Sequence, residues 1–397
     1  MPRQIEEAYV VAATRTPIGK AHRGSFRNTR PDDLLAFALR AALATVPSLD
    51  PAAIEDVVVG CALPEGVQGY NVARIGLLLA GLPDTVGGIT INRFCSSGLN
   101  AVSMAADRIR CGEADVMIAA GVESMSMVPM SGHHPSFNER IYTDENYGIA
   151  YGMGLTAERV AQQWKVSREA QDAFALQSHQ RALAAQAAGE FTDISPIEVV
   201  DVVPDLQTRR IERRSRTLAL DEGPRADTSA EALARLRPVF AAKGSVTAGN
   251  ASQTSDGAGA LVLMSGAALA RFNLTPMARF ASFAVVGVPP EVMGIGPKAA
   301  IPKALERAGI RQDDLDWIEL NEAFAAQALA VMNELGLDPA RVNPLGGAIA
   351  LGHPLGATGA IRSAQLIHGL QRRQGRYGMV TMCVGTGMGA AGIFERV

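Results

Sequence analysis

Cysteine is scarce in this chain. Four cysteines occur among 397 residues, and no two of them form a Cys-x-x-Cys pair. The missing pair argues against a structural zinc site and a thioredoxin-like redox centre, and we predict no metal site. Four thiols are also too few to cross-link a chain of this length, so we expect a reducing compartment. The four are Cys61, Cys95, Cys111 and Cys383.

Strong charge and long apolar runs are also missing. The formal net charge is -3, which leaves no basic field for nucleic acid. No apolar stretch reaches the roughly 18 residues that a membrane-spanning helix needs. The first residues are polar and unlike a signal peptide, and the last ones, Phe394-Glu-Arg-Val397, match no targeting motif. We therefore expect a soluble cytoplasmic protein with no nucleic-acid partner and no membrane insertion.

What is present is a globular α/β pattern. Hydrophobic residues make up 48% of the chain, and short β-rich runs alternate with Ala- and Leu-rich helical runs. Several strand candidates are apolar without alternation, as strands covered on both faces are. The predicted strands are 8–13, 56–60, 116–121, 259–264, 280–286, 317–320 and 377–383. The predicted helices are 32–44, 97–110, 167–188, 297–308, 322–335 and 358–370.

A weak internal repeat divides the chain. The pattern of residues 53–60 returns at 313–320, and that of 112–121 returns at 375–383. Two similar halves would bring distant segments together, although any two α/β halves look somewhat alike. Residues between the halves are too many for a loop, so we expect an inserted unit with its own helices that covers a substrate site. The predicted units are 1–123 plus 250–275, the insertion 124–249, and 276–397.

Cys95 stands at a strand-to-helix junction, in Ile91-Asn-Arg-Phe-Cys95-Ser-Ser-Gly98. Backbone dipoles and free N–H groups at a helix N-terminus stabilise a thiolate and can hold an oxyanion. A nearby histidine would also keep the thiol charged at neutral pH. A small buried structural thiol is the alternative reading.

His353 lies in a glycine-rich segment, Gly346-Gly-Ala-Ile-Ala-Leu-Gly-His353-Pro-Leu-Gly356. The glycines allow close backbone approach, and the following proline fixes the turn that carries the imidazole. A core histidine satisfied by backbone groups is the alternative, and the density of glycine on both sides makes an active-site role the better interpretation.

Cys383 follows a buried strand and precedes the glycine turn Gly385-Thr-Gly387-Met-Gly389, whose N–H groups could hold an anion. The overlapping G-x-G-x-x-G match has no room after it for a helix and second strand, so we reject dinucleotide binding.

Asn321 follows a predicted strand and is either a helix N-cap or a holder of water or carbonyl groups. Spacing does not decide between these two.

Together these segments resemble the thiolase family. The match comprises Cys95-Ser-Ser-Gly98, Asn321-Glu-Ala-Phe324, the Gly346–Pro354 segment and Cys383-Val-Gly-Thr-Gly-Met-Gly389, in family order. The resemblance runs from Arg15-Thr-Pro-Ile-Gly19 to the end of the chain. It implies a duplicated, layered α/β/α/β/α core of two similar halves with an inserted loop domain.

The resemblance also implies site roles. Cys95 would be acylated, His353 would take its proton, and Cys383 would be the acid and base. His353 with a water held by Asn321 would form one oxyanion site. The N–H groups of Cys95 and Gly385 would form the other. Two thiols are needed because an acylated cysteine cannot also deliver a proton to the departing carbanion.

Coenzyme A is expected as a co-substrate, with no permanently bound cofactor. By position in the family pattern, its contacts and the acyl end would fall on Met153, Arg225, Ala248, Ser252, Met293, Ala323 and Phe324. Plain core packing is the alternative for each apolar one. A basic run is interpreted mainly as a solvated loop, with steering of CoA phosphates as the minor option. It comprises Arg209, Arg210, Arg213, Arg214 and Arg216.

The sequence resembles the degradative branch of the family. Ser96 follows the first cysteine and Gly152 precedes Met153, whereas biosynthetic members usually have glycine and histidine there. The implied activity is thiolysis of 3-ketoacyl-CoA, as in fatty-acid β-oxidation. The implied partners are acyl-CoA and CoA, and a second copy in a homodimer or homotetramer. Some bacterial degradative members also assemble with a hydratase/dehydrogenase subunit.

Other activities remain as alternatives. An acetoacetyl-CoA thiolase would run the Claisen condensation instead. A decarboxylating ketoacyl synthase would use one cysteine with two further His- or Asn-type partners, and Cys383 argues against it. A non-catalytic acyl-CoA binding protein should have lost one of Cys95, His353 or Cys383, and all three are present.

Overall fold

The computed structural model describes residues 5–205 and 207–397. One ten-stranded sheet system runs through the molecule in the order β10-β11-β12-β9-β1-β8-β5-β3-β4, with β2 paired to β8. Its strands are β1 Tyr9–Arg15, β2 Gly19–Lys20, β3 Asp56–Gly60, β4 Gly87–Ile91, β5 Val116–Ser124, β8 Ser255–Met264, β9 Ala278–Gly287, β10 Leu315–Leu320, β11 Tyr377–Val384 and β12 Met388–Arg396.

The two halves of this sheet have the same topology. From β1 outward the N-terminal half reads β1-β8-β5-β3-β4, with two antiparallel and then two parallel pairings. From β9 outward the C-terminal half reads β9-β12-β11-β10, also antiparallel twice and then parallel. A parallel bridge from Ile318 to Val342 extends it at the position of β4. The halves join where Tyr9 and Val10 pair with Arg279 and Ala278, so the repeat is confirmed.

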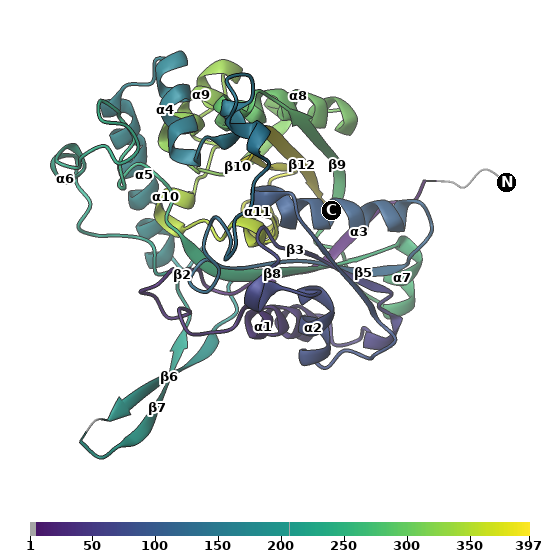
Figure 1. Ribbon diagram of the computed structural model, residues 1–397. Coiled ribbons are helices and arrows are strands. Elements are labelled where there is room, and N and C mark those ends of the chain that lie inside the picture. The colour runs from purple at the N-terminus through teal and green to yellow at the C-terminus, as the bar shows by residue number, and fades with distance from the viewer. Residues whose placement is uncertain (1–4, 206) are drawn as a thin grey trace.

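Helices form three layers around the two half-sheets. Figure 1 shows α1 and α2 outside the N-terminal half, α8 and α9 outside the C-terminal half, and α3 and α11 between them. Each of the three helix layers packs on its half-sheet or half-sheets through its own core of buried apolar side chains. The duplicated α/β/α/β/α core is therefore confirmed. The helices are α1 Pro31–Ala44, α2 Val72–Leu79, α3 Ser97–Arg110, α4 Met153–Gln163, α5 Arg168–Ala187, α6 Ala230–Ala234, α7 Gly266–Phe272, α8 Gly296–Ala308, α9 Ala325–Leu335, α10 Ala348–Leu351 and α11 Leu355–Arg373.

The apolar strand runs are buried as their sequences predict. Every residue of β5 and β8 is buried, because helices cover both faces of the N-terminal half-sheet. The helix predicted at 167–188 is also confirmed as α5, and the Ser167 hydroxyl caps it by accepting the Ala170 N–H at 3.2 Å. No helix among the described residues is both long and apolar enough to cross a bilayer.

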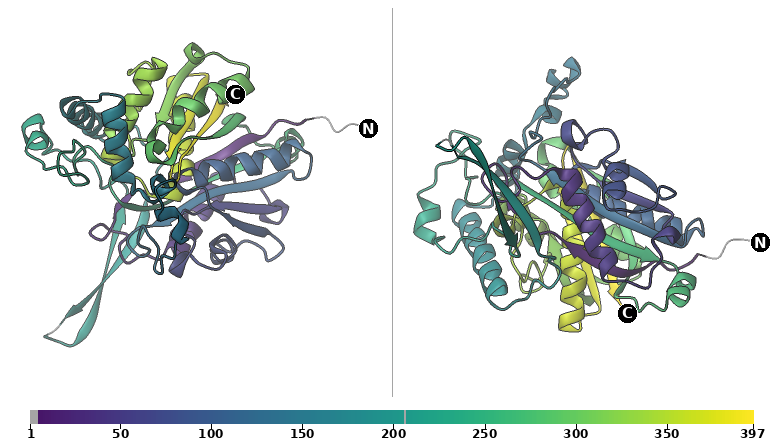
Figure 2. Two further views of the ribbon diagram at one scale, coloured as in Figure 1. Left: turned by 45° about the horizontal axis from the view of Figure 1, so that its top comes forward. Right: turned by 90° about the horizontal axis from the view of Figure 1, so that it is seen from below.

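The segment between β5 and β8 carries α4, α5, α6 and a hairpin of β6 (Ile197–Asp205) and β7 (Arg210–Leu218). Figures 1 and 2 show this hairpin extending away from the body. The basic run that we interpreted as a solvated loop is thus mostly strand β7, which makes that prediction wrong in conformation. Its exposure is as expected, since Arg210 to Thr217 lie largely in solvent. The unit boundaries stay a proposal.

A buried ion pair ties the inserted segment to the core. Arg15, at the end of β1, is fully buried and pairs with Asp193 at 2.5 Å and with Asp221 at 2.7 Å. Removing one partner from such a pair leaves an uncompensated buried charge, which is strongly destabilising. The segment is therefore fixed to the end of the interior strand β1 at both Asp193 and Asp221.

Candidate active site

Cys95 lies in a short 3₁₀ turn, Phe94–Ser96, between β4 and α3. The preceding Phe94 has a φ of +43°, so the backbone turns sharply there, just before helix α3 begins. Cys95 is half-buried, and the N–H of Gly385 donates a hydrogen bond to its sulfur. The first thiol is thus reachable and already touches the glycine turn of the other half.

Cys383 lies inside β11 and is fully buried. It is near enough to Cys95 for a charge on that sulfur to raise the pKa of Cys383. The glycine turn after it spans only residues 385–387, with Thr386 and Gly387 at positive φ, and β12 begins at Met388. The longer turn that we predicted from the glycine run is wrong, because residues after 387 pair with β11.

His353 connects α10 to α11 and is 4% exposed. Its Nδ1 lies 2.6 Å from the hydroxyl of Thr358, and its Nε2 lies 3.4 Å from the amide nitrogen of Asn321. Its backbone N–H donates to the carbonyl of Gln253 and to the hydroxyl of Ser255. The imidazole is thus oriented on both ring nitrogens and anchored at the backbone.

The two central helices bring these segments together. Cys95 lies two residues before the start of α3, and His353 lies two residues before the start of α11. The two helix starts pack so closely that a methyl group on Gly98 would lie 2.8 Å from the carbonyl oxygen of Gly356. Glycine is required at this contact because any side chain would push the helices apart.

Asn321 is not a helix N-cap. Helix α9 begins at Ala325 with Phe324 at the cap position, so the helix predicted from residue 322 starts three residues late. The Asn321 side chain instead turns toward His353, and its buried Oδ1 accepts no hydrogen bond from any residue that the structure describes. The N-cap interpretation is wrong, and an acceptor remains for a small polar group beside the imidazole.

Both thiols and the imidazole are neutral at pH 7. Burial raises the pKa of Cys95 to about 12, although the Gly385 N–H counteracts this. Burial also raises the pKa of Cys383, and it lowers that of His353 to about 3 with the help of the Arg362 charge. The expectation of a resting thiolate is therefore wrong, because desolvation outweighs the helix terminus. Proton transfer must accompany attack.

Two buried carboxylates, which we did not predict as part of the site, hold its turns in place. Glu123, at the end of β5, accepts the N–H of Ala62 and of Gly356, each at 2.8 Å. Glu322 accepts the Ser178 hydroxyl at 2.7 Å and the Ile349 N–H at 3.1 Å. Both glutamates lie in the part of the sequence that resembles the thiolase family. Each is an acidic residue at the end of a buried strand, and this is the signal that could have identified them.

Most residues predicted to contact substrate border Cys383. An apolar cluster joins this thiol to Met153, Met293, Ala323 and Phe324. The Ser252 N–H donates to the carbonyl of Ala323, which brings that predicted contact beside the cluster. Phe240, which sequence reasoning missed, meets Phe324 edge-on at a centroid distance of 6.0 Å.

The remaining predicted contacts are exposed. Ala248 and Arg225 both reach solvent, and the Arg225 guanidinium lies 3.3 Å from Asp227. Exposure therefore increases from Met293, which is 3% exposed, to Arg225, whose side chain is 58% exposed. A long ligand with an apolar reacting end and an anionic outer end fits such a gradient.

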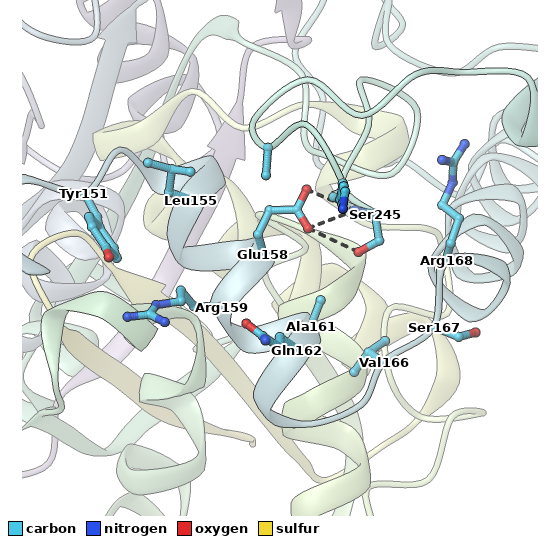
Figure 3. Close-up of a pocket in the computed structure, with 13 residues that line it drawn as sticks. Tyr151, Leu155, Glu158, Arg159, Ala161, Gln162, Val166, Ser167, Arg168 and Ser245 are labelled. Carbon is cyan, nitrogen blue, oxygen red and sulfur yellow. Dashed lines mark hydrogen bonds between the residues drawn. The ribbon is translucent and has the colours of Figure 1, made fainter.

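A separate hollow of about 590 Å³ lies on the other face of α4. Figure 3 shows Leu155, Glu158 and Gln162 from α4 around it, with Glu158 bonded to Ser245. None of the predicted site residues lines it. Met153 and Ala157 on the same helix border Cys383 instead, so α4 separates this hollow from the thiols.

Family models assign this arrangement. Residues 8–267 match the model described as "Thiolase, N-terminal domain", and residues 274–396 match "Thiolase, C-terminal domain". The chain belongs to the thiolase family. The thiolase halves described by these models meet between residues 267 and 274, next to the β1–β9 junction of the sheet.

Named thiolase relatives cover nearly the whole chain. The 3-ketoacyl-CoA thiolase of Bacillus subtilis is 50% identical over 98% of this chain and 100% of its own. The peroxisomal 3-ketoacyl-CoA thiolase B of Mus musculus is 46% identical over 98% and 91%.

Solved structures agree in fold. The Bacillus anthracis acetyl-CoA acetyltransferase matches with a TM-score of 0.88 at 40% identity, over 99% of this chain and 100% of that one. Human mitochondrial 3-ketoacyl-CoA thiolase has the same TM-score at 39% identity, over 100% of both chains. Membership of this family makes the chain an acyltransferase.

Proposed function

We propose that this protein is a 3-ketoacyl-CoA thiolase. It cleaves a 3-ketoacyl-CoA with CoA into acetyl-CoA and an acyl-CoA two carbons shorter. The observation that carries the proposal is the meeting of Cys95 with the Gly385 turn and Cys383, since these come from opposite halves of the molecule. The names of the full-length relatives support it.

The first half-reaction forms the acyl-enzyme. The Cys95 sulfur adds to the 3-keto carbon while its proton passes to His353. The bond between C2 and C3 then breaks, and its electron pair leaves on the acetyl-CoA enolate. Cys383 gives its proton to C2, which releases acetyl-CoA and leaves a thiolate.

The second half-reaction transfers the acyl group. The Cys383 thiolate takes the proton of an incoming CoA thiol, whose sulfur attacks the Cys95 thioester. Cys95 leaves and recovers its proton from His353, so all protons balance. Neutral resting thiols suit this cycle because each proton is needed at a particular step.

Two donor sets stabilise the oxyanions. The N–H groups of Cys95 and Gly385 face the tetrahedral intermediate, and the Gly385 N–H already points at the sulfur. The ring N–H of His353 and a water both donate to the enolate oxygen, and the unpartnered amide oxygen of Asn321 holds that water by accepting its other proton. Loss of one such donor typically costs on the order of 10²–10³ in rate.

CoA binds along the gradient of exposure described above. Met293 and Phe324 border the acyl end, Ser252 and Met153 follow, and Arg225 lies at the phosphate end. CoA acts as substrate and not as a resident cofactor. The cytoplasmic location and a hydratase/dehydrogenase partner stay predictions, and several named relatives are peroxisomal.

A second copy of the chain is the proposed structural partner. Strand β4 ends the sheet, and one of its edges has no partner strand among the described residues. Exposed apolar side chains surround this edge, and such an edge favours pairing with another chain. They are Ile75, Leu78, Leu79, Ile89 and Met104.

The test is turnover with 3-ketoacyl-CoAs of increasing chain length plus CoA, followed by acetyl-CoA release. Cleavage of six-carbon and longer substrates supports the proposal. A strong preference for acetoacetyl-CoA would instead support the biosynthetic alternative, which the similarity to an acetyl-CoA acetyltransferase structure favours. Absence of both reactions and of any acyl adduct would leave the binding-protein alternative.

A further inference from the structure

A fully buried cation lies beneath the His353 turn. Arg362 projects from α11 and is 2% exposed. Its Nη1 donates to the side chain of Gln365 at 2.9 Å and lies 3.7 Å from the carboxylate of Glu319 on β10. Its Nη2 lies 3.4 Å from the carbonyl oxygen of Gly352. Burying such a charge costs several kcal/mol before its partners compensate, so a function beyond stability is worth seeking.

The contact between Arg362 and the Gly352 carbonyl holds the peptide group that leads into His353. The carbonyl of Gly352 and the N–H of His353 are the two ends of one peptide group. Arg362 holds the carbonyl end, while Gln253 and Ser255 accept the N–H end. Gly352 has a φ of +105°, and a methyl group there would lie 2.4 Å from the Ser255 hydroxyl. The peptide is therefore clamped from both sides in a conformation that only glycine adopts easily.

The counter-ion of Arg362 is itself fixed. Glu319 accepts the indole N–H of Trp317 at 2.7 Å and the amide of Gln365 at 3.1 Å. Burial raises the pKa of Glu319 to about 7, while the Arg362 charge lowers it. The side chains of Arg362, Glu319, Trp317 and Gln365 thus form one connected network.

We propose that Arg362 is a positioning residue for His353: its guanidinium fixes the peptide that carries the imidazole. The ring must be neutral to accept the Cys95 proton, and burial and the Arg362 charge both lower its pKa. Once it carries that proton, the ring must point its N–H at the enolate oxygen. This inference rests on the proposed function. It assigns Arg362 no contact with substrate.

The test variant is Arg362→Gln, and the assay is thiolysis of acetoacetyl-CoA. Intact-mass titration counts the protein molecules whose Cys95 can be acylated, and kcat is expressed per such molecule. We expect kcat to fall on the order of 10- to 100-fold with the KM for CoA unchanged, since no CoA contact is altered. Acylation should also weaken more between pH 7 and pH 5 than in the parent, because His353 gains protons more easily once the cation is gone.

Several charged or titratable groups could affect that pH profile, and loss of the Arg362 charge also raises the pKa of Glu319 and of Glu322. The groups are Arg362 on α11, Glu319 on β10, Glu322 after β10, Glu123 on β5, Cys95 before α3 and Cys383 on β11. Arg362→Lys keeps the charge but not the planar fork, so it should restore the pH profile and only part of kcat. A purely structural arginine would not produce this split.

The matched control is Arg341→Gln. Arg341 also donates to the backbone near β10, at the carbonyls of Asp313 and Leu315, but far from the histidine turn. It should lower thermal stability without changing kcat per active site. If Arg362→Gln does not fold, the double variant Glu319→Leu with Arg362→Met removes both charges together and leaves no uncompensated ion.

The proposal is overturned if Arg362→Gln, or the double variant where the single one does not fold, keeps the parental kcat per active site and the parental pH profile. Its thermal stability does not affect this conclusion. The parent protein separates this failure from that of the proposed function. A parent that forms no Cys95 adduct refutes the thiolase assignment, whereas a parent and an Arg362→Gln variant that acylate equally refute only the role of Arg362.

Discussion

At the scale of single residues, environment sets what each thiol does. Cys95 and Cys383 have the same chemistry in solution, yet one is half-buried and touches an N–H group, and the other is sealed in an apolar cluster. The accessible sulfur suits nucleophilic attack, and the sealed one suits proton transfer at a desolvated carbon.

Substitution should separate these roles. Cys95→Ala should abolish the acyl adduct seen by mass spectrometry, because no sulfur remains to accept the acyl group. Cys383→Ala should still be alkylated at Cys95 but should lose thiolysis by on the order of 10²–10⁴. The control is Cys111→Ala, an exposed cysteine at the end of α3, which should behave as the parent. An adduct on Cys95→Ala would refute the assignment.

The pH dependence of alkylation should show that the resting thiol is protonated. The pKa of Cys95 is raised to about 12, so its thiolate fraction grows about tenfold per pH unit below that value. The iodoacetamide rate of the free protein should therefore keep rising from pH 7 to pH 9. A plateau below pH 8 would mean that the thiolate already exists without substrate.

At the scale of elements, two helix starts and two carboxylates build the site. Helices α3 and α11 meet through glycines, so the residues just before them, Cys95 and His353, come together. Glu123 ties β5 to the turn after His353 through Gly356. Cys95 and His353 thus stand on short turns held by rigid elements, which suits precise placement.

Adding a side chain at the contact between α3 and α11 should lower kcat by more than the loss of folding stability accounts for. At Gly98, a methyl group would lie 2.7 Å from the backbone nitrogen of Ala360. Gly98→Ala should therefore cost about 1–3 kcal/mol of unfolding free energy and lower kcat as the two turns separate. Thermal melting and thiolysis measure the two effects.

Gly266→Ala is the matched control for this change. It sits at the start of helix α7, where the nearest atom to an added methyl group is 3.9 Å away. This variant should melt at or slightly above the parental temperature and keep full activity. Equal behaviour of the two variants would mean that the helix contact does not position the site.

At the scale of the whole molecule, duplication explains why residues so far apart share one site. The equivalent half-sheets place α3 and α11 back to back in a common central layer, visible in Figure 1. The same architecture leaves β4 at the end of the sheet, close to the Cys95 turn that follows it.

Dimer formation through β4 should depend on its apolar edge. Ile89 is 43% exposed in the single chain, and Ile89→Lys would place a charge on the edge. Light scattering after size exclusion should show a dimer for the parent and a monomer for this variant. Ile211→Lys, an exposed apolar residue on the hairpin, is the control and should stay dimeric. A dimeric Ile89→Lys protein would place the interface elsewhere.

The sequence alone determined the layered fold, the repeat and the candidate reactive residues. Unbroken apolar strands predict sheets covered on both faces, and glycine turns beside Cys95, His353 and Cys383 indicate close backbone approach. These signals are local, and each depends on a few neighbouring residues.

Only the tertiary structure decided the protonation states, the role of Asn321 and the network around Arg362. Each depends on burial and on groups contributed by distant segments. Desolvation overcame the helix terminus at Cys95, and a late start of α9 freed Asn321 to face the histidine. Local patterns cannot reveal such effects, because the free energy of a buried charge or proton is set by everything that surrounds it.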